Sequence, residues 1–524
     1  MNLYRATGTI GGLTLVSRVF GFIRDMLLAR VLGAGLAADA YQLAFRLPNT
    51  FRRLFAEGAF SVAFVPMFSE RLAGPGGEAE AERFSANVLS VFVWVLAIFT
   101  AILLVIMPGV VWLLASQFQE IPGKFELAVE LSRLAFPYLA LISLVSLQTG
   151  ILNSMSRFGP GASAPILFNL TLISGIALGW WLRGDSGDDE IVVRALAVAI
   201  SLSGLVQLIW LWFWLRRTGF RLKIGRPRFS PEVKELGVLI LPATFGAGIY
   251  QLSQLIDTFF ATSLPQGSLT LLSMGDRLNQ MPLGIVGIAL GTAILPALSR
   301  SIASNDEAGA ARVQSNAVEL AMLLTLPAAA ALAICALPFV NAFFVGGRFT
   351  PENGVTTANI VVALVAGLPA YVMVKILTPG FFARKDTRTP VYTAATVLAF
   401  NVVLILLLIE PYGIVGLAAA TAAASWLNTV LLYAILHHRG HFRLAPSLIG
   451  RIGRQIVATA AMSAMLYWLA RALGDMFLGS WADRLIALVA VVAAGMFVYF
   501  TVGYLVGAVD REKLATLTKR RIAS

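Results

Sequence analysis

The sequence predicts an all-α polytopic membrane protein with about fourteen transmembrane helices. Of its 524 residues, 58% are hydrophobic and only 13% are charged, whereas soluble domains carry about 25% charged residues. Apolar runs of the roughly 20 residues that cross a bilayer core recur along the chain. We expect helices centred near residues 18, 55, 100, 140, 170, 203, 247, 285, 327, 367, 399, 424, 463 and 495.

A repeat at an offset of 230 residues sets the expected arrangement of these helices. The residues that recur at this spacing are Pro66 and Pro296, Pro108 and Pro338, and Gly150 and Gly380. The repeat predicts two six-helix lobes related by a pseudo-twofold axis along the membrane normal, followed by two further helices. We expect an N-terminal lobe at residues 1–217, a basic cytoplasmic linker at 218–234, a C-terminal lobe at 235–440, and the last two helices with a basic tail at 441–524.

The distribution of charge predicts the topology. The net charge is +12, and the basic residues gather in alternate loops, as the positive-inside rule requires of cytoplasmic loops. One linker alone holds Arg216, Arg217, Arg221, Lys223, Arg226, Arg228 and Lys234. We therefore expect a multi-pass protein of the cytoplasmic (inner) membrane with both termini in the cytoplasm. The basic residues lack interleaved aromatics, so nucleic acid is not an expected partner.

Several classes of chemistry are not expected. The single cysteine, Cys335, lies in an apolar run, which leaves no disulfide framework within the chain and no cysteine metal cluster. The sequence has no Walker motif or dinucleotide fingerprint. We predict a transporter rather than an enzyme, with no catalytic residues and no cofactor.

Five arginines crowd the first two hydrophobic segments: Arg18, Arg24, Arg46, Arg52 and Arg53. A charge at the bilayer centre costs about 3 kcal/mol on insertion scales, so such residues usually face a polar cavity and mark a substrate path. Guanidinium groups suit phosphate because their planar fork offers paired N–H donors. The cluster predicts an anionic substrate, and several arginines around one cavity indicate a diphosphate.

Helical spacing indicates which of these groups act together. Asn49, Arg52, Arg53 and Glu57 follow one another at i, i+3, i+4 and i+8, so they form one polar stripe. The alternative reading of this stripe is a juxtamembrane amphipathic segment whose arginines pair with Glu57 and reach the head groups.

On the first helix, Ser17, Gly21 and Arg24 share one face, while Arg18 and Asp25 share another. Four acids, Asp25, Asp39, Glu57 and Asp276, are expected to hold the arginines when no substrate is bound. For any one arginine, pairing with an acid is also an alternative explanation of its presence.

Three segments resemble the hallmark sequences of the MurJ (MviN) family. They read SRVFGFIRDMLLARVLGAG, DAYQLAFRLPNTFRRLFAEGAFSVAFVPMF and GDRLNQMPLGIVGIALGTAILPALSRS. This family comprises bacterial lipid II flippases of the multidrug/oligosaccharidyl-lipid/polysaccharide (MOP) exporter superfamily, whose fold is MATE-like. The resemblance runs through essentially the whole chain.

The resemblance implies a function and a set of site residues. The function is movement of an undecaprenyl-diphosphate-linked peptidoglycan precursor, lipid II, from the inner to the outer leaflet by alternating access. The residues implied for substrate binding are Arg18, Arg24, Arg52, Arg53, Arg277, Ser17 and Asn49, and the implied cavity acids are Asp25, Asp39, Glu57 and Asp276. The helices near 463 and 495 are implied to form a groove for the lipid tail, with membrane lipids as further partners.

The sequence departs from the family pattern at two of the implied sites. Met274 and Gly275 precede the Asp-Arg of the eighth helix, where an aromatic residue and an alanine are usual. Some members resemble sodium-coupled transporters, and Asp257, Asn401 and Thr421 match that cation site, but Ile405 replaces a second expected carboxylate. The alternative is that Asp257 is only a satisfied buried polar residue. Transport is expected to draw on the membrane potential or on a Na+ or H+ gradient.

Three other functions compete with this prediction. A multidrug exporter of the same superfamily would carry acidic rather than arginine-rich cavities. A flippase for another lipid-linked oligosaccharide would share the diphosphate and differ in the sugar. A scaffold for cell-wall synthesis proteins would use the arginines only as structural pairs.

Overall fold

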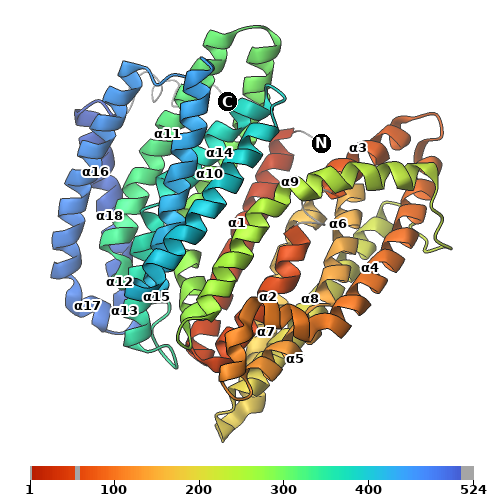
Figure 1. Ribbon diagram of the computed structural model, residues 1–524, viewed down its shortest axis with the longest axis horizontal. Helices are drawn as coiled ribbons and strands as arrows, with labels where there is room; N and C mark the ends of the chain where they lie inside the picture. Colours follow the sequence, from red (N-terminus) through yellow and green to blue (C-terminus); the bar gives the residue numbers. More distant parts are fainter. Residues whose placement is uncertain (1–2, 54–59, 509–524) are drawn as a thin grey trace. The chain divides into compact units, whose positions relative to one another are not determined.

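A computed structural model describes residues 3–53 and 60–508, and within these ranges the chain is almost entirely helical (Figure 1). Only one isolated β-bridge, between Gly346 and Phe349, occurs in the described part. Contacts divide the chain into two compact units, Met1–Thr270 and Leu271–Ser524. The all-α prediction is therefore confirmed.

The first unit is built from a helical series in which α7 packs on α1 and α8, and α2 packs on α5. Its helices are α1 (Leu3–Leu32), α2 (Leu36–Arg52), α3 (Phe60–Ala73), α4 (Gly77–Ala115), α5 (Lys124–Ala135), α6 (Tyr138–Ser154), α7 (Phe158–Arg183), α8 (Asp189–Arg217) and α9 (Pro231–Thr262), with the short 3-10 helices η2 (Ser116–Glu120) and η3 (Gly184–Ser186).

The second unit has its core between α11, α14 and α15, while α16 packs on α11 and α18 packs on α16. Its helices are α10 (Ser268–Ala303), which begins in the first unit, then α11 (Glu307–Ile334), α12 (Ala336–Phe343), α13 (Pro351–Val365), α14 (Leu368–Phe382), α15 (Arg388–His438), α16 (Pro446–Ala472), α17 (Gly474–Leu478) and α18 (Trp481–Leu505). Cys335 is buried in the apolar cluster between α11, α12 and the C-terminal helices, as a packing residue.

Local sequence explains where many of the helices begin. The Asp306 carboxylate accepts a hydrogen bond from the Gly309 N–H at 2.7 Å and caps α11. Ser480 and Asp483 form a reciprocal capping box at the start of α18. Such caps satisfy the N–H groups that have no partner within the first helical turn.

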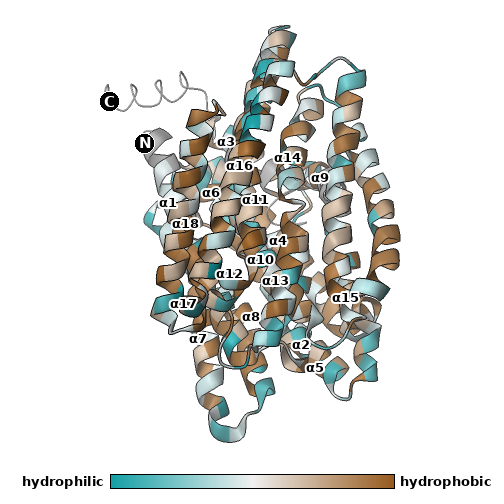
Figure 2. Ribbon diagram, turned by 90° about the vertical axis from the view of Figure 1, so that its left-hand side faces the viewer, coloured by the Kyte–Doolittle hydropathy of each residue, from teal (hydrophilic) through white to brown (hydrophobic). Residues whose placement is uncertain are grey.

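Eight helices of the described part are long and apolar enough to cross a membrane. In the most apolar stretch of Arg388–His438 only 22% of the residues are buried, and Leu407 is 65% exposed. Figure 2 shows that hydrophilic residues gather near the ends of many helices. Apolar surface of this kind is expected where lipid replaces water as the solvent. The chain is a multi-pass membrane protein, while the count of fourteen helices remains a prediction.

The repeat recurs in the boundaries of the helices. Three pairs of helices begin 230 residues apart: α4 with α11, α6 with α14, and α7 with α15. Two pairs end 230 residues apart: α3 with α10, and α5 with α13. In addition, α15 bends at Gly413, where φ is 55° and ψ is −133°. Gly184 ends α7 with almost the same angles, 48° and −134°. The bend therefore separates two helices that correspond to α7 and α8.

The division by contacts does not follow the repeat. The helix α9 opens the second repeat in sequence, yet it packs on α3 and α4 and is grouped with the first unit. The expected boundaries at 217, 234 and 440 describe the repeat, and as domain boundaries they remain a prediction.

Candidate functional site

The predicted site residue Arg24 is buried in the first unit, where α1, α2 and α7 meet. Its side chain is only 7% exposed. The Nε and Nη2 groups donate hydrogen bonds to Asp25 Oδ1 at 3.0 and 2.7 Å, and the guanidinium lies 5.5 Å from the ring centre of Phe45 and 5.7 Å from that of Phe168. Asp25 therefore neutralises Arg24, as expected of an acid that holds an arginine in a buried place.

Asn169 on α7 completes the surroundings of Arg24. Its Oδ1 accepts a hydrogen bond from Arg24 Nη1 at 3.1 Å, and its Nδ2 donates to the Ser17 and Pro165 carbonyl oxygens, both at 3.0 Å. A β-carbon added at Gly21 would lie 3.4 Å from the same amide. The predicted common face of Ser17, Gly21 and Arg24 is thus the face that meets Asn169.

Asp39 lies in a second buried polar cluster, between α2, α5 and the start of α10. Its carboxylate is paired with Lys124 Nζ at 3.0 Å, and both side chains are almost fully buried. It also accepts hydrogen bonds from the Gly267 and Thr270 N–H groups at 2.7 and 3.1 Å and from the Thr270 hydroxyl at 2.8 Å. Lys124 lies 4.1 Å from the ring centre of Phe118.

This arrangement corrects one expectation. Asp39 was expected to hold an arginine, but its partner is Lys124. The physical reason is that the first N–H groups of a helix have no partner within the helix and attract negative charge, so the start of α10 and a lysine ammonium together satisfy the carboxylate.

The polar stripe on α2 is partly accessible. Arg52 donates from Nε and Nη2 to Asn49 Oδ1 at 3.1 and 2.9 Å, which confirms that these residues share a face. Arg53 follows at the end of the helix and is half-buried. Glu57 lies outside the described residues.

Arg46 and Arg18 are also half-buried in the first unit. Arg46 Nη1 donates to the Thr258 hydroxyl at 2.7 Å, which connects α2 to α9. The buried pairs Arg24–Asp25 and Asp39–Lys124 are each neutral overall. The arginines of α1 and α2 whose side chains remain partly exposed to a ligand are Arg18, Arg46, Arg52 and Arg53.

The remaining predicted substrate residues lie on α10 in the second unit. Asp276 accepts a hydrogen bond from Gln280 Nε2, with distances of 3.4 and 3.5 Å to its two oxygens. Arg277 is half-buried. Asp276 and Arg277 therefore lie in a partly exposed part of α10, and the neutral amide of Gln280 lies one turn further along the helix.

The predicted sodium ligands are divided between the units. Asp257 is on α9 in the first unit, while Asn401 and Thr421 lie on either side of the bend at Gly413 in α15. Thr421 donates its hydroxyl to the Leu417 carbonyl oxygen at 3.1 Å. The sodium site remains a prediction.

Sequence reasoning did not single out Asn169 and Lys124. Asn169 interrupts the apolar run ILFNLTL on α7, and a lone amide in such a run is a usable signal. Lys124 starts a helix in the expected loop region between two spans, where a lysine carries no signal of burial.

Known proteins of one family match this chain over nearly its whole length. The family model for the lipid II flippase MurJ matches residues 28–506. A probable lipid II flippase MurJ of Rhizobium meliloti (strain 1021) is 42% identical over 99% of this chain and 97% of that protein. A probable lipid II flippase MurJ of Vibrio cholerae is 34% identical over 95% of each chain.

Solved structures share the fold. A lipid II flippase MurJ in an inward closed conformation matches with a TM-score of 0.75 and 23% identity, covering 95% of this chain and 98% of that one. An inward-facing multidrug resistance MATE transporter of the MOP superfamily matches with a TM-score of 0.66 and 14% identity, over 82% and 97% of the two chains. The family match, the extent of the identity and the shared fold show that this chain belongs to the MurJ family of lipid II flippases.

Proposed function

We propose that this protein moves lipid II from the inner to the outer leaflet of the cytoplasmic membrane by alternating access. Support comes from its membership of the MurJ family over nearly the whole chain. The observation that carries the proposal is the set of half-buried arginines on two helices of a membrane protein. A multidrug exporter for cations would not be expected to concentrate positive charge in this way.

The proposed substrate contacts are made by Arg18, Arg52, Arg53 and Arg277, whose half-buried side chains remain accessible to a ligand. A guanidinium keeps its charge at any physiological pH and binds phosphate oxygens in pairs. Arg24 would act differently, because Asp25 already occupies two of its donors. A diphosphate that reaches Arg24 must compete with Asp25, so this pair would hold the arginine ready in the empty state.

The energy would come from the membrane potential or from an ion gradient. A charge that crosses the membrane gains about 2.3 kcal/mol per 100 mV. A potential that is negative inside drives an anion outward, which is the proposed direction. Orientation with both termini in the cytoplasm, and Na+ binding by Asp257, Asn401 and Thr421, belong to the same proposal.

The test is leaflet-resolved flipping of purified lipid II in proteoliposomes with a clamped potential. Arg52→Ala and Arg277→Ala are the main variants, because both side chains are partly exposed and their loss leaves no fully buried gap. Each variant is expected to slow flipping by about tenfold or more, because each loses a charge-assisted pair of hydrogen bonds to the substrate phosphate. Arg24→Ala should abolish flipping, but it also leaves Asp25 without its buried partner.

The matched control is Arg312→Ala, since Arg312 is strongly exposed on α11 and its ion pair with Asp306 is long, at 3.8 Å. It should flip lipid II at the native rate. If the native protein fails with lipid II but moves another lipid diphosphate, the substrate assignment is wrong and the arginine site survives. Native rates in Arg52→Ala and Arg277→Ala would overturn the proposed site.

A further inference from the structure

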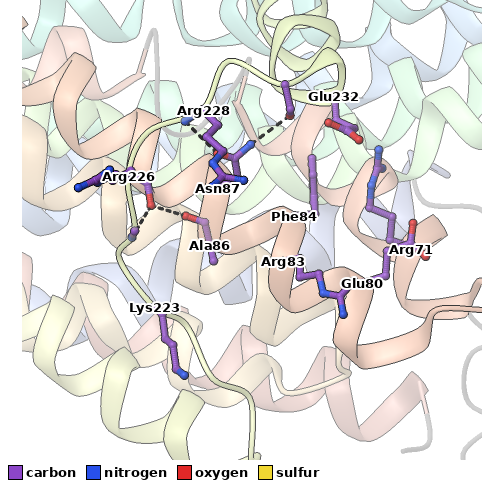
Figure 3. Close-up of a pocket in the computed structure, with 13 residues that line it drawn as sticks. Arg71, Glu80, Arg83, Phe84, Ala86, Asn87, Lys223, Arg226, Arg228 and Glu232 are labelled. Carbon is purple, nitrogen blue, oxygen red and sulfur yellow. Dashed lines mark hydrogen bonds between the residues drawn. The ribbon is translucent and has the colours of Figure 1, made fainter.

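A basic pocket of about 670 Å³ lies in the first unit, between the start of α4 and the linker from residue 218 to 230 (Figure 3). Its lining includes five cations and two acids. The cations are Arg71, Arg83, Lys223, Arg226 and Arg228, and the acids are Glu80 and Glu232. The excess of positive charge suits a phosphate group.

Hydrogen bonds to Asn87 and Ser90 hold the linker against α4 beside the pocket. The Ser90 hydroxyl accepts from the Gly225 N–H at 2.8 Å, and Asn87 Oδ1 accepts from the Arg228 N–H at 3.2 Å. Asn87 Nδ2 donates to the Ser230 hydroxyl at 3.1 Å. These bonds use the linker backbone and the Ser230 hydroxyl, so they leave the charged ends of the linker's basic side chains for another partner.

Arg71 forms a fixed wall of the pocket. Its guanidinium lies 4.2 Å from the ring centre of Phe84, and its Nη1 donates to the Met67 carbonyl oxygen at 2.8 Å. A guanidinium held by an aromatic face is already oriented, and an oriented donor loses less entropy when it binds an anion.

The position of the pocket along α4 corresponds to the head-group layer. The uninterrupted apolar run of this helix begins at Val91, and Asn87 lies four residues before it. At 1.5 Å per residue this separation is about 6 Å. The polar layer on each side of the hydrocarbon core is about 5–8 Å thick. The lining residues from Asn87 to Ser90 therefore lie at the depth of lipid head groups, and Arg83, one turn further from the apolar run, lies at the aqueous edge of that layer.

The same linker exposes apolar side chains between its cations. Ile224 is 68% exposed and Phe229 is 66% exposed, and they alternate with Lys223, Arg226 and Arg228. Exposed apolar residues among basic ones are typical of segments that lie on an anionic membrane surface. A soluble phosphate ligand would give no reason for them.

We propose that this pocket binds the phosphate of an anionic phospholipid from the leaflet that the linker faces. The lipid phosphate would lie between Arg83 on α4 and Arg228 on the linker, while Ile224 and Phe229 enter the acyl boundary. Because the linker joins the two repeats, a bound lipid would hold it against α4. The site is separate from the arginines of α1 and α2 and does not depend on which lipid is transported.

The test is titration of the purified full chain in a non-ionic detergent with three probes. These are dioctanoyl phosphatidylglycerol, dioctanoyl phosphatidylcholine and inorganic phosphate, with binding followed by calorimetry. The native chain should bind phosphatidylglycerol in a saturable manner and about tenfold or more tighter than phosphatidylcholine. Arg83→Gln/Arg228→Gln should lose about tenfold or more of that affinity, because two charge-assisted contacts are removed.

Two further variants separate the explanations, and the apparent Tm of each variant verifies that it is folded. Arg312→Gln/Arg443→Gln removes the same charge from exposed positions of the second unit and should bind as the native chain does. Ile224→Ser/Phe229→Ser should weaken phosphatidylglycerol and leave inorganic phosphate unchanged.

Three results would overturn the proposal. The first is native affinity for phosphatidylglycerol in Arg83→Gln/Arg228→Gln. The second is equal affinity for inorganic phosphate and phosphatidylglycerol with no effect of Ile224→Ser/Phe229→Ser, which would indicate a soluble anion. The third is loss of binding in Arg52→Ala instead, which would assign the lipid to the transport arginines.

Discussion

The two repeats form the same series of helices, but the buried charges on α1, α2 and α5 of the first repeat have no charged counterparts in the second. At the offset of 230, the charged residues of the first repeat correspond to neutral residues of the second. The pairs are Arg24 and Gln254, Asp25 and Leu255, Asp39 and Leu269, and Lys124 and Gly354. The second repeat shows that these helices form without such charges. The buried charges of the first repeat are therefore explained by function or by specific packing rather than by helix formation.

Where the repeats do agree, the agreement is in neutral residues. Asn49 corresponds to Asn279, and prolines within helices and Gly150 and Gly380 recur at the same offset. Arg46 corresponds to Asp276, so the sign of charge is reversed there. A binding site built from both repeats would thus be positive mainly on the side of the first, and the predictions below test that asymmetry.

The largest expected effect is on the buried pair of Asp39 and Lys124. Asp39→Ala removes the partner of a lysine that is 2% exposed, and it also removes the acceptor for two backbone N–H groups. Breaking a buried pair from one side costs about 3–5 kcal/mol. We expect a large fall in the apparent Tm of the purified protein.

Asp276→Asn tests the loss of an acid in the second repeat. Asp276 is half-buried and meets the Gln280 amide at 3.4–3.5 Å, so its loss of charge should cost below about 1 kcal/mol. The double variant Asp39→Leu/Lys124→Gly copies the second repeat and should be less destabilised than the sum of its single changes. Equal losses for Asp39→Ala and Asp276→Asn would refute the asymmetry.

A smaller effect is expected at Asn169, which corresponds to Ala399 in the second repeat. Asn169→Ala removes the acceptor for Arg24 Nη1 and the donor to the Ser17 carbonyl oxygen. Leaving buried polar groups unpaired costs about 1–3 kcal/mol. We expect slower lipid II flipping at an unchanged quantity of folded protein, because Arg24 loses a group that orients it.

Ala399→Ser is the control for this change, because Ala399 is exposed on α15 and a small hydroxyl there should alter neither flipping nor apparent Tm. If Asn169→Ala flips lipid II as fast as the native protein does, Asn169 does not orient Arg24 for transport.

Sequence reasoning predicted the regular part of this molecule. Apolar runs and the 230-residue offset predict the helices and their repeat, and helical spacing predicts that Asn49 and Arg52 share a face. Both kinds of inference depend on residues that are close in the sequence. The charged helices α1 and α2 are not among the eight described helices that are long and apolar enough to cross a membrane, and α2 has only 17 residues.

Contacts between distant segments were not predictable in the same way. Lys124 is 85 residues from Asp39, and Asn169 is 145 residues from Arg24. No periodicity connects such positions, so the sequence predicts an arginine rather than Lys124 as the partner of Asp39. The basic residues of the linker at 218–234 predict topology alone, because its hydrogen bonds to Asn87 and Ser90 depend on the packing of the linker beside α4.

The two glycine bends provide a test of what the repeats share. Gly184 and Gly413 both have positive φ with ψ near −134°, and a β-carbon would meet nothing within 4 Å at either position. The cost of Gly184→Ala or Gly413→Ala therefore comes only from backbone strain, about 1–3 kcal/mol in such regions. We expect similar falls in apparent Tm for the two variants.

Gly237→Ala is the control for backbone strain. Gly237 lies inside α9 with open space around it, and alanine is favoured over glycine in a helix by about 1 kcal/mol. The apparent Tm should stay unchanged or rise. A fall for only one of Gly184→Ala and Gly413→Ala would mean that the bends are not equivalent.

The smallest expected effect concerns two corresponding loops, one between α6 and α7 and the other between α14 and α15. In the second repeat, Asp386 accepts hydrogen bonds from Arg439 at 2.6 Å and from the Thr389 hydroxyl at 2.6 Å. Burial alone would raise the pKa of Asp386, but the bonds from Thr389 and Arg439 outweigh it and hold this pKa well below its ordinary value. The loop of the first repeat has Ser156 at the corresponding position.

His441, which follows the end of α15, makes the surroundings of this second loop sensitive to pH, whereas the first loop contains no histidine. Burial, followed by the positive charge of Arg384, lowers the pKa of His441 below its ordinary value of 6.5. The other charged groups that act on it are Glu307, Arg439 and Asp386. A lowered histidine pKa means that the unfolded chain binds the proton more readily, so this contribution to stability is present above pH 6.5 and is lost as the pH falls below it. We expect the apparent Tm to decline between pH 7.5 and 5.5, and His441→Gln to reduce that decline.

His438→Gln is the matched control, because His438 is exposed at the end of α15 and should leave the decline as it is in the native protein. Asp386 stays ionised throughout this range because its pKa is lowered, so Asp386→Asn should lower the apparent Tm by a similar amount at both pH values. A decline that His441→Gln does not change would assign the acid sensitivity to another part of the molecule, and the difference between the two loops would then lie only in the Asp386–Arg439 contact.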